Sequence, residues 1–237
     1  MSVIILRNGA VHYEVMGRGR PLVFLHGWVG SWRYWMPVMQ VVSTGFRAYA
    51  LDLWGFGDTA RIAERFTLDE QAVLIDGFMQ EMGIAKAIII GHGLGAMVAM
   101  LFAVQHQRNV DRLMCVGLPG VRQGINPRLF HSPAGELIDW LLGRSPDGDA
   151  VRMETPKADP AALETALKNM LSVDVVELYS NLNLPCLLVQ GLQDTLTDAA
   201  LAQNQLPECV HQIIFERSGH FPMLDEPSKF KDRKSVV

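Results

Sequence analysis

The chain has 237 residues, of which 49% are hydrophobic, and its formal charge of −4 comes from 21 basic and 25 acidic side chains. This length is sufficient for one α/β domain with an insertion and a sizeable buried core. Lysine and arginine are scattered rather than grouped in runs, which argues against a nucleic-acid partner and favours a small neutral or modestly charged ligand.

Cysteine usage and the N-terminal residues indicate the cellular compartment. Cys115, Cys186 and Cys209 lack the close spacing of metal and redox motifs. We therefore expect reduced thiols in a cytoplasmic protein. No phosphate loop or dinucleotide fingerprint is found in the sequence, so neither a cofactor nor a metal is expected. The apolar residues 1–6 are followed by Arg7 rather than by a small-residue cleavage site, so no signal peptide is expected.

Predicted strands and helices alternate along most of the chain. Asn8-Gly9 is a hairpin signal between apolar segments, which predicts an antiparallel pair of strands at residues 3–6 and 10–15. Further strands are predicted at 22–25, 48–51, 86–90, 113–116, 186–190 and 212–215, and helices at 32–42, 68–82 and 96–105. Thr67 and Glu70 form a capping box at the start of the second helix. Such alternation is typical of a mainly parallel sheet with helices on both faces.

One uncharged segment, residues 87–104, is long enough to be tested as a membrane span. Three glycines and a histidine within 91–95 divide it into a short strand and a helix. We therefore expect no membrane-spanning helix.

The alternation stops between residues 118 and 183, where six prolines separate short amphipathic segments such as 136–142 and 161–171. We interpret 118–183 as a helical cap inserted into a single core formed by 1–117 and 184–231. After Pro227 only three residues are amphipathic, so the last helix is expected to be truncated. Residues 232–237 match one reading frame of a common sequencing adapter and are expected to be non-native.

Four short motifs follow predicted strands in a fixed order. They are His26-Gly27-Trp28, the segment 52–57, Gly91-His92-Gly93-Leu94-Gly95, and Gly191-Leu192-Gln193-Asp194 followed by Ser218-Gly219-His220. Together they resemble the α/β-hydrolase fold over residues 8 to 230, in its small-cap branch that is similar to esterases and haloperoxidases. The third motif has the strand–turn–helix setting of a G-x-S-x-G nucleophile elbow, but Gly93 stands at the nucleophile position.

The resemblance implies a role for each motif. His220 would be the general base, and Asp194 would hold its imidazole in the correct tautomer. The backbone N–H groups of Trp28 and Leu94 would stabilise the oxyanion, with Gly27 beside them in the substrate site. Asp198 is a weaker candidate for the acid. The alternatives are a hydrogen-bonded loop histidine at 220 and an ordinary turn carboxylate at 194.

Other conspicuous residues are expected to support the structure. His26 and His92 are interpreted as hydrogen-bonded supports, and Asp52 as a residue that shapes its turn. Two interpretations are open for Trp28, Trp32 and Trp35, which line the pocket mouth or pack on the sheet. The cap carries Phe130, Trp140 and several Leu and Met residues, so a moderately apolar pocket is expected.

Glycine at position 93 has two opposite consequences. The elbow backbone is strained for any residue with a Cβ by about 1–3 kcal/mol, and glycine removes that strain. The loss of a nucleophilic serine costs roughly a millionfold in rate in well-studied serine hydrolases. Ser31 and Ser218 lie near the oxyanion loop and the base, so neither occupies the elbow.

Three interpretations are compatible with Gly93. In the first, water activated by His220 hydrolyses a small carbonyl compound, such as an ester, thioester, lactone or amide-like substrate. The local sequence is similar to the aminoacrylate hydrolase group, which also has a small residue at the elbow. In the second, the chain is a non-catalytic ligand-binding or regulatory protein that keeps the pocket. In the third, it is a serine esterase in which Gly93 is a single engineered or erroneous substitution. The sequence leaves the oligomeric state open.

Overall fold

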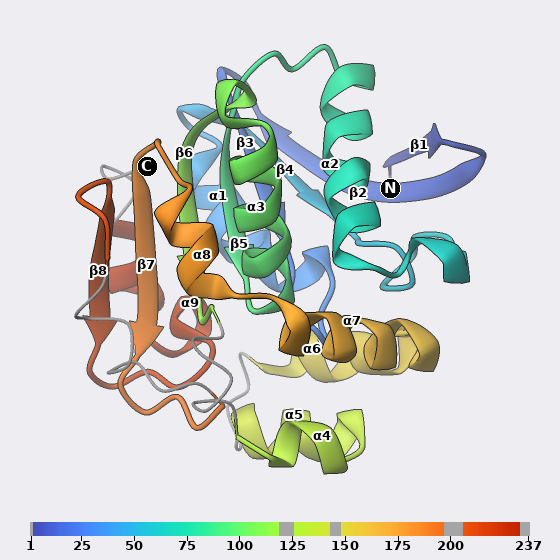
Figure 1. The fold of residues 1–237 in the computed structure, drawn as a ribbon, viewed down its shortest axis with the longest axis vertical. Coiled ribbons are helices and arrows are strands. Elements are labelled where there is room, and N and C mark those ends of the chain that lie inside the picture. The colour runs from blue at the N-terminus through green and yellow to red at the C-terminus, as the bar shows by residue number, and fades with distance from the viewer. Residues whose placement is uncertain (1, 119–125, 143–147, 197–205, 233–237) are drawn as a thin grey trace.

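The computed structural model describes residues 2–118, 126–142, 148–196 and 206–232, which form an eight-stranded sheet. The strand order is β1-β2-β4-β3-β5-β6-β7-β8 (Figure 1). Their bounds are β1 Ser2–Leu6, β2 Gly9–Gly17, β3 Arg20–Leu25, β4 Phe46–Leu51, β5 Ala87–His92, β6 Val110–Val116, β7 Cys186–Gly191 and β8 Val210–Phe215. The six strands β4, β3, β5, β6, β7 and β8 are parallel to one another, whereas β2 is antiparallel to β1 and β4. The predicted α/β-hydrolase sheet is therefore confirmed.

The N-terminal hairpin turns one residue earlier than the sequence indicates. Gly9 pairs with Leu6 in the ladder, so the two-residue loop is Arg7-Asn8 rather than Asn8-Gly9. Both loop residues have positive φ, 49° at Arg7 and 64° at Asn8, as a tight hairpin requires. The Arg7 guanidinium pairs with the carboxylate of Glu70 on α2 (Leu68–Glu81). That tertiary contact is absent from the local sequence signal.

Both faces of the sheet are buried, which explains why the central strands are almost continuously apolar. On β5, Ile89 packs with the helices α2 (Leu68–Glu81), α3 (Leu94–Gln105) and α8 (Val175–Ser180). Ile88 and Ile90 point to the other face, which is covered by η1 (Trp32–Trp35), α1 (Met36–Val42), α9 (Pro222–Asp225) and α10 (Pro227–Lys231). In Figure 1, α2 and α3 lie in front of the sheet and α1 behind it.

The helix α2 begins with half of the predicted capping box. Thr67 Oγ1 accepts a hydrogen bond from the Glu70 backbone N–H at 3.3 Å. The Glu70 carboxylate pairs with Arg7 and thereby ties the start of α2 to the hairpin. Its side chain is thus used in a tertiary contact rather than in the reciprocal bond of the box.

The segment between β6 and β7 forms short helices beyond the carboxyl ends of the strands (Figure 1). They are α4 Arg128–His131, α5 Ala134–Leu142, α6 Asp149–Glu154, η6 Thr155–Lys157 and α7 Pro160–Ser172. The next helix, α8, returns to the sheet and contacts α3. Several contacts fasten these helices to the core, among them the hydrogen bond that Trp28 Nε1 donates to the Leu163 carbonyl at 2.9 Å and the pairing of Arg33 with the buried Glu154.

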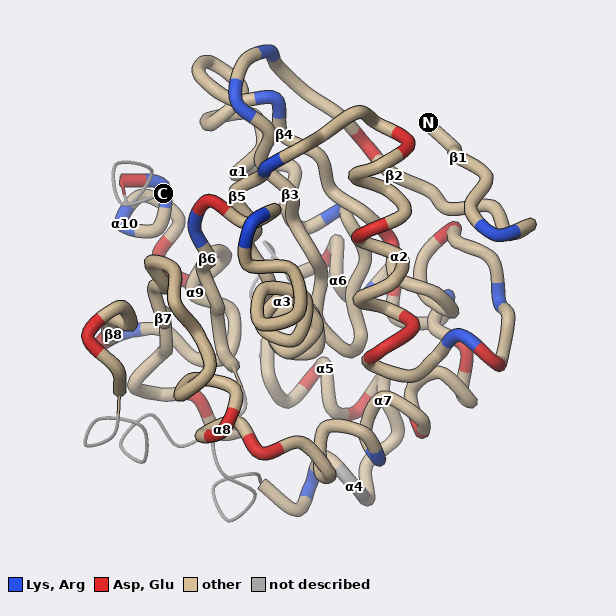
Figure 2. The backbone as a smooth tube through the Cα atoms, turned by 45° about the horizontal axis from the view of Figure 1, so that its top comes forward, with Lys and Arg blue, Asp and Glu red and all other residues tan. Residues whose placement is uncertain are grey.

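Two properties of the described residues bear on partners. Lysine and arginine, blue in Figure 2, and aspartate and glutamate, red, are spread around the outside without gathering into one basic patch. A helix of the length and apolarity needed to cross a membrane is not found among the residues that the structure describes.

The last predicted helix is α10, with five residues, and residues 233–237 of the expected tail lie outside the described residues.

Candidate active site

The elbow lies between β5 and α3, and Gly93 forms its sharp turn. Its φ of 52° and ψ of −112° lie in a region that side chains strain to adopt. The Gly93 N–H donates to the Val116 carbonyl at 2.9 Å, which fixes the turn to the neighbouring strand. A Cβ placed on Gly93 would stand 3.4 Å from His220 Nε2 and 3.7 Å from Gly27 Cα. The position therefore has ordinary contact space for a side chain directed at His220.

His220 and Asp194 are joined by a hydrogen bond of 2.8 Å between Nδ1 and Oδ2. Asp194 follows β7 and His220 follows β8, so two neighbouring strands bring them together. The Asp194 side chain is fully buried, and its Oδ1 also accepts from the Leu196 backbone N–H at 2.8 Å. Because a carboxylate only accepts, Nδ1 carries the proton and Nε2 keeps its lone pair. Asp198, the weaker candidate, lies outside the described residues.

The two predicted oxyanion donors flank Gly93. Leu94 is the first residue of α3, where backbone N–H groups have no partner within the helix. Neither Leu94 N–H nor Trp28 N–H donates to another group in the part of the chain that the structure describes. His26 fixes the peptide that carries the Trp28 N–H, because its Nδ1 donates to the Gly27 carbonyl at 2.8 Å. In a trans peptide the N–H points away from the carbonyl, so His26 sets the direction of this donor.

His26 and His92 are both buried and hydrogen-bonded, as supports are expected to be. His26 Nε2 accepts from the Leu53 N–H at 3.0 Å. His92 Nε2 lies 2.9 Å from the His220 carbonyl, and its Nδ1 lies 2.9 Å from the Tyr34 hydroxyl. Burial lowers the pKa of His26 and places the pKa of His92 well below its ordinary value. Tyr34 has no motif around it and was not predicted from the sequence.

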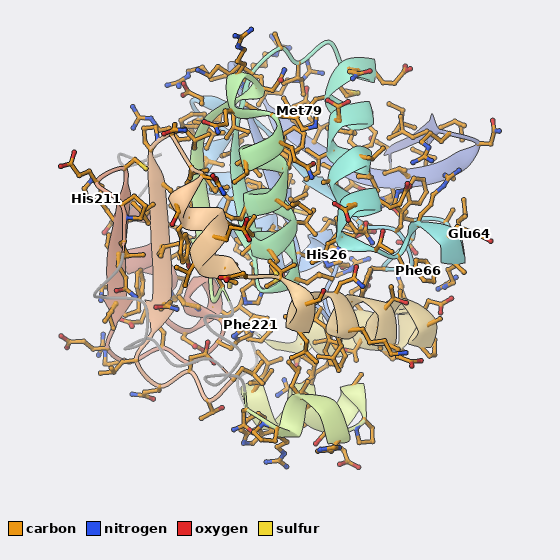
Figure 3. All side chains as sticks on the ribbon, viewed as in Figure 1. His26, Glu64, Phe66, Met79, His211 and Phe221 are labelled. Carbon is orange, nitrogen blue, oxygen red and sulfur yellow. The ribbon has the colours of Figure 1, made fainter. Side chains whose placement is uncertain are left out.

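A cavity of about 30 Å³ opens beside Gly93 and His220. Its core side is lined by Gly27, Trp28, Val29, Gly30, Tyr34, His92, Gly93, Leu94, His220 and Phe221. Its other side is apolar and consists of Leu129, Leu137, Leu141 and Met170, from the segment between β6 and β7, and of Leu196 from the loop after β7. In Figure 3, His26 and Phe221 lie toward the end of the sheet that faces α4 to α7, whereas Met79 lies toward its other end.

The aromatic residues singled out in the sequence separate into lining and packing positions. Trp28 lines the cavity, whereas Trp32 and Trp35 are buried in the core on the α1 face. Trp140 is not among the lining residues and lies under the Arg128 guanidinium, 4.6 Å from its ring centre. The side chain of Phe130 lies outside the described part of the structure.

The serines near the site are engaged elsewhere. Ser31 Oγ accepts from the Arg33 backbone N–H at 3.2 Å, and Ser218 Oγ donates to Glu226 Oε2 at 2.7 Å. Neither contributes to the cavity beside Gly93.

A second histidine–aspartate pair lies away from this cavity. Asp52 Oδ2 contacts His12 Nδ1 at 2.8 Å and accepts from the Asp58 N–H at 3.0 Å, while Oδ1 accepts from the Trp32 N–H at 2.8 Å. Asp52 thus shapes its turn, as its position after β4 indicates. His12, which was not predicted from the sequence, is buried, and its Nε2 lies 3.4 Å from Glu14 Oε1.

The charges around His12 decide its protonation. Burial alone would lower its pKa, but the hydrogen bond and charge of Asp52, with Asp58 and Glu14, outweigh burial and raise the pKa. His12, Asp52 and Asp58 are close enough for one atom from each to bind a single metal ion. Asp52 is hydrogen-bonded to His12 Nδ1 and to the Asp58 N–H, and the Asp58 carboxylate pairs with Lys157.

Two curated proteins are similar to this chain over different lengths. A curated relative, the pimeloyl-[acyl-carrier protein] methyl ester esterase of Vibrio vulnificus (strain CMCP6), is 26% identical over 246 residues and covers 93% of this chain and 94% of its own length. The soluble epoxide hydrolase of Corynebacterium sp. (strain C12) is 35% identical over 140 residues, which are 58% of this chain and 48% of that protein.

Solved structures share the fold at lower identity. A crystal structure of the N-acyl homoserine lactonase AidH, a serine-to-glycine mutant complexed with N-hexanoyl homoserine lactone, has a TM-score of 0.88 and 20% identity. It covers 99% of this chain and 96% of that one. The sequence profile of the alpha/beta hydrolase family matches residues 22–233. With its strand order and elbow, the chain therefore belongs to the alpha/beta hydrolase family.

Proposed function

We propose that this protein hydrolyses a small ester, thioester or lactone by using water activated by His220 in place of a serine nucleophile. One observation carries the proposal. His220 Nε2 and the N–H groups of Trp28 and Leu94 border a single cavity, and none of them has a hydrogen-bond partner among the described residues. A base and two donors without partners are the groups that acyl transfer requires.

The proposed reaction is a general-base hydrolysis. A water molecule beside Gly93 gives a proton to His220 Nε2 while its oxygen attacks the substrate carbonyl carbon. The resulting oxyanion accepts from the Trp28 and Leu94 N–H groups. Asp194 stabilises the positive imidazolium through the 2.8 Å hydrogen bond. His220 then returns the proton to the leaving alcohol or thiol as the carbon–oxygen or carbon–sulfur bond breaks.

The lining of the cavity supports an uncharged substrate with an aliphatic acyl group. Aspartate, glutamate, lysine and arginine are absent from the described lining residues, and the cap contributes leucines and one methionine. The names of the relatives agree with this class, because one acts on a methyl ester and a structural neighbour is a lactonase. The polar atoms of Tyr34 and His92 are already hydrogen-bonded, so the lining offers few other polar contacts to a substrate.

The test compares the unmodified protein with His220→Ala, using 4-nitrophenyl butyrate and a butyryl thioester as substrates. Turnover above the rate in buffer that is lost in His220→Ala supports the proposal. His12→Asn is the matched control, since His12 belongs to the other buried histidine–aspartate pair and should keep its turnover per folded molecule.

Two outcomes would overturn the hydrolytic proposal. Equal turnover in the parent and in His220→Ala would remove His220 from the chemistry. A panel of esters that raises the melting temperature of the parent but is recovered intact would indicate a ligand-binding protein, which is the alternative function for this cavity.

A further inference from the structure

We propose that His92 and Tyr34 are positioning residues that hold the base loop and the oxyanion loop in register through one continuous chain of buried hydrogen bonds. This series of hydrogen bonds connects Gly27, Tyr34, His92 and His220. The Gly27 N–H lies 2.5 Å from the Tyr34 hydroxyl oxygen, that oxygen lies 2.9 Å from His92 Nδ1, and His92 Nε2 lies 2.9 Å from the His220 carbonyl oxygen. The proposal rests on the proposed function, because it assigns His220 as the base.

The direction of each hydrogen bond follows from its chemistry. The His220 carbonyl can only accept, so His92 Nε2 carries the proton. A neutral imidazole then has a lone pair on Nδ1, which accepts from the Tyr34 hydroxyl. The hydroxyl oxygen in turn accepts from the Gly27 N–H. The three bonds run in one direction, and removing any member leaves a buried donor or acceptor without a partner.

Burial keeps the side chains of His92 and Tyr34 neutral. His92 is 1% exposed and Tyr34 is 2% exposed. Burial, and then the nearby His220, places the pKa of His92 well below its ordinary value, and burial raises the pKa of Tyr34. Neither group therefore titrates near neutral pH. The donor and the acceptor of each of the three hydrogen bonds therefore stay the same while His220 takes up and releases its proton.

The series of hydrogen bonds reaches both the base loop, which carries His220, and the oxyanion loop, which carries Trp28. At one end, His220 is held by its imidazole Nδ1 on Asp194 and by its carbonyl on His92, so the ring and the backbone are both fixed. At the other end, Gly27 precedes Trp28, whose N–H is an oxyanion donor. The His92 ring packs so closely on Gly27 that a Cβ there would lie 2.7 Å from Nδ1. Because His92 also precedes the nucleophile position in the chain, one side chain sets the spacing between base, nucleophile position and donor.

The test uses Tyr34→Phe, which removes the hydroxyl and keeps the ring, with Tyr179→Phe as a control at another buried tyrosine. We expect Tyr34→Phe to lower kcat about 10-fold to 100-fold, the range seen when catalytic groups are misplaced slightly, with KM within about twofold of the parent. Tyr179→Phe should leave kcat unchanged. Equal kcat in the two variants would overturn the proposal.

Two His92 variants separate the ends of the chain. His92→Gln keeps a donor that reaches the His220 carbonyl, and His92→Asn keeps a partner for the Tyr34 hydroxyl. We expect His92→Gln to retain more kcat than His92→Asn, because the base is held at the Nε2 end. The reverse order would contradict the assignment.

A spectroscopic measurement keeps this test separate from the proposed function. The proton on His220 Nδ1, bonded to Asp194, gives a downfield NMR signal that identifies the pair. Tyr34→Phe should shift or broaden this signal, and Tyr179→Phe should not. A signal that is unchanged in Tyr34→Phe overturns the positioning role even if the parent hydrolyses no ester, whereas a shifted signal without turnover removes only the proposed function.

Discussion

Among the residues that the structure describes, two buried histidine–aspartate pairs have the same short distance and different surroundings. His220 Nδ1 and Asp194 Oδ2 are 2.8 Å apart, and so are His12 Nδ1 and Asp52 Oδ2. His220 Nε2 borders the cavity beside the elbow glycine. His12 Nε2 is buried and lies against Glu14 rather than beside a cavity. The hydrogen bond between imidazole and carboxylate is therefore common to both pairs, and the environment of Nε2 separates them.

Their positions in the fold explain the difference. Asp194 and His220 follow parallel strands at the end of the sheet that the cap covers, where loops converge on the elbow. His12 lies within β2, and Asp52 follows β4 and accepts backbone N–H groups that shape the next turn. A base needs an open nitrogen beside a nucleophile, whereas His12 Nε2 is buried and has no such access.

Gly93→Ser is expected to have the largest effect, because it adds the group that the His220 pair lacks. The serine Cβ would start 3.4 Å from His220 Nε2, so its hydroxyl falls within reach of the base. We expect kcat for an activated ester to rise by about a thousandfold or more, up to the roughly millionfold worth of a serine nucleophile. Steady-state release of 4-nitrophenolate measures it.

The same substitution should cost stability. A side chain at the positive φ of position 93 is strained by about 1–3 kcal/mol. Urea unfolding of Gly93→Ser and the parent measures this loss. A folded Gly93→Ser protein without any gain in turnover would show that the His220 pair is not arranged for catalysis.

Asparagine substitution of the two acids should separate activity from stability. In the Gly93→Ser background, Asp194→Asn should lower kcat about 10⁴-fold, because the amide favours the wrong tautomer of His220. Asp52→Asn should lower the free energy of unfolding by about 3–5 kcal/mol, since it removes one charge from a buried hydrogen-bonded pair. Its kcat per folded molecule should stay within about twofold. Kinetics and urea unfolding of both variants give the comparison, and a large kcat loss in Asp52→Asn alone would invert it.

The buried histidines should give opposite pH dependences of stability. The pKa values of His26 and His92 are lowered, so the unfolded chain binds protons below pH 6.5 that the folded chain does not. Stability should then fall below pH 6.5 by up to about 1.4 kcal/mol per pH unit for each of them. The pKa of His12 is raised, so its contribution is present below pH 6.5 and is lost as pH rises through its folded value.

Urea unfolding between pH 5 and 8 measures both trends. His12→Asn should remove the loss on the alkaline side and leave the acidic side unchanged. A parent that is more stable at pH 5 than at pH 7 would contradict the assignment of His26 and His92 as neutral groups.

Trp28→Phe should have the smallest effect, because it removes one hydrogen bond between the cavity wall and the cap. The Trp28 indole N–H donates to the Leu163 carbonyl of α7, whereas the Trp32 indole beside His12 has no partner among the described residues. We expect KM to rise by several-fold in Trp28→Phe, about 1 kcal/mol, as the cap loses this contact. Trp32→Phe is the matched control and should leave KM unchanged. Equal KM in the two variants would show that the contact does not affect the substrate site.

The local sequence was sufficient to predict most strands of the sheet. Apolar strands and helical periodicity predicted the alternation, and the structure confirms the strands of the parallel part, such as β3 and β7. The predicted position of the hairpin turn was wrong by one residue, because Gly9 pairs with Leu6 in the ladder and Arg7 and Asn8 form the loop, where Arg7 also contacts Glu70, far along the chain. Contacts of this kind carry no local signal.

The candidate site divides in the same way. Gly93, Asp194 and His220 lie in short motifs and were predicted as site residues, whereas Tyr34 and His12 lie in none and were missed. Their roles arise from partners distant in sequence: Tyr34 contacts His92, and His12 contacts Asp52. A single sequence does not show such pairs, because the sheet order that brings them together follows from the packing of the whole chain.

Intact-mass measurement of the protein during turnover of an activated ester tests the central claim most directly, namely that the His220 site lacks only the nucleophile's side chain. The account predicts that Gly93→Ser gains the mass of one acyl group, which peptide mapping locates at position 93, while the parent stays unmodified as it releases acid. A folded Gly93→Ser protein without the adduct would contradict the account, and so would an acyl group on the parent.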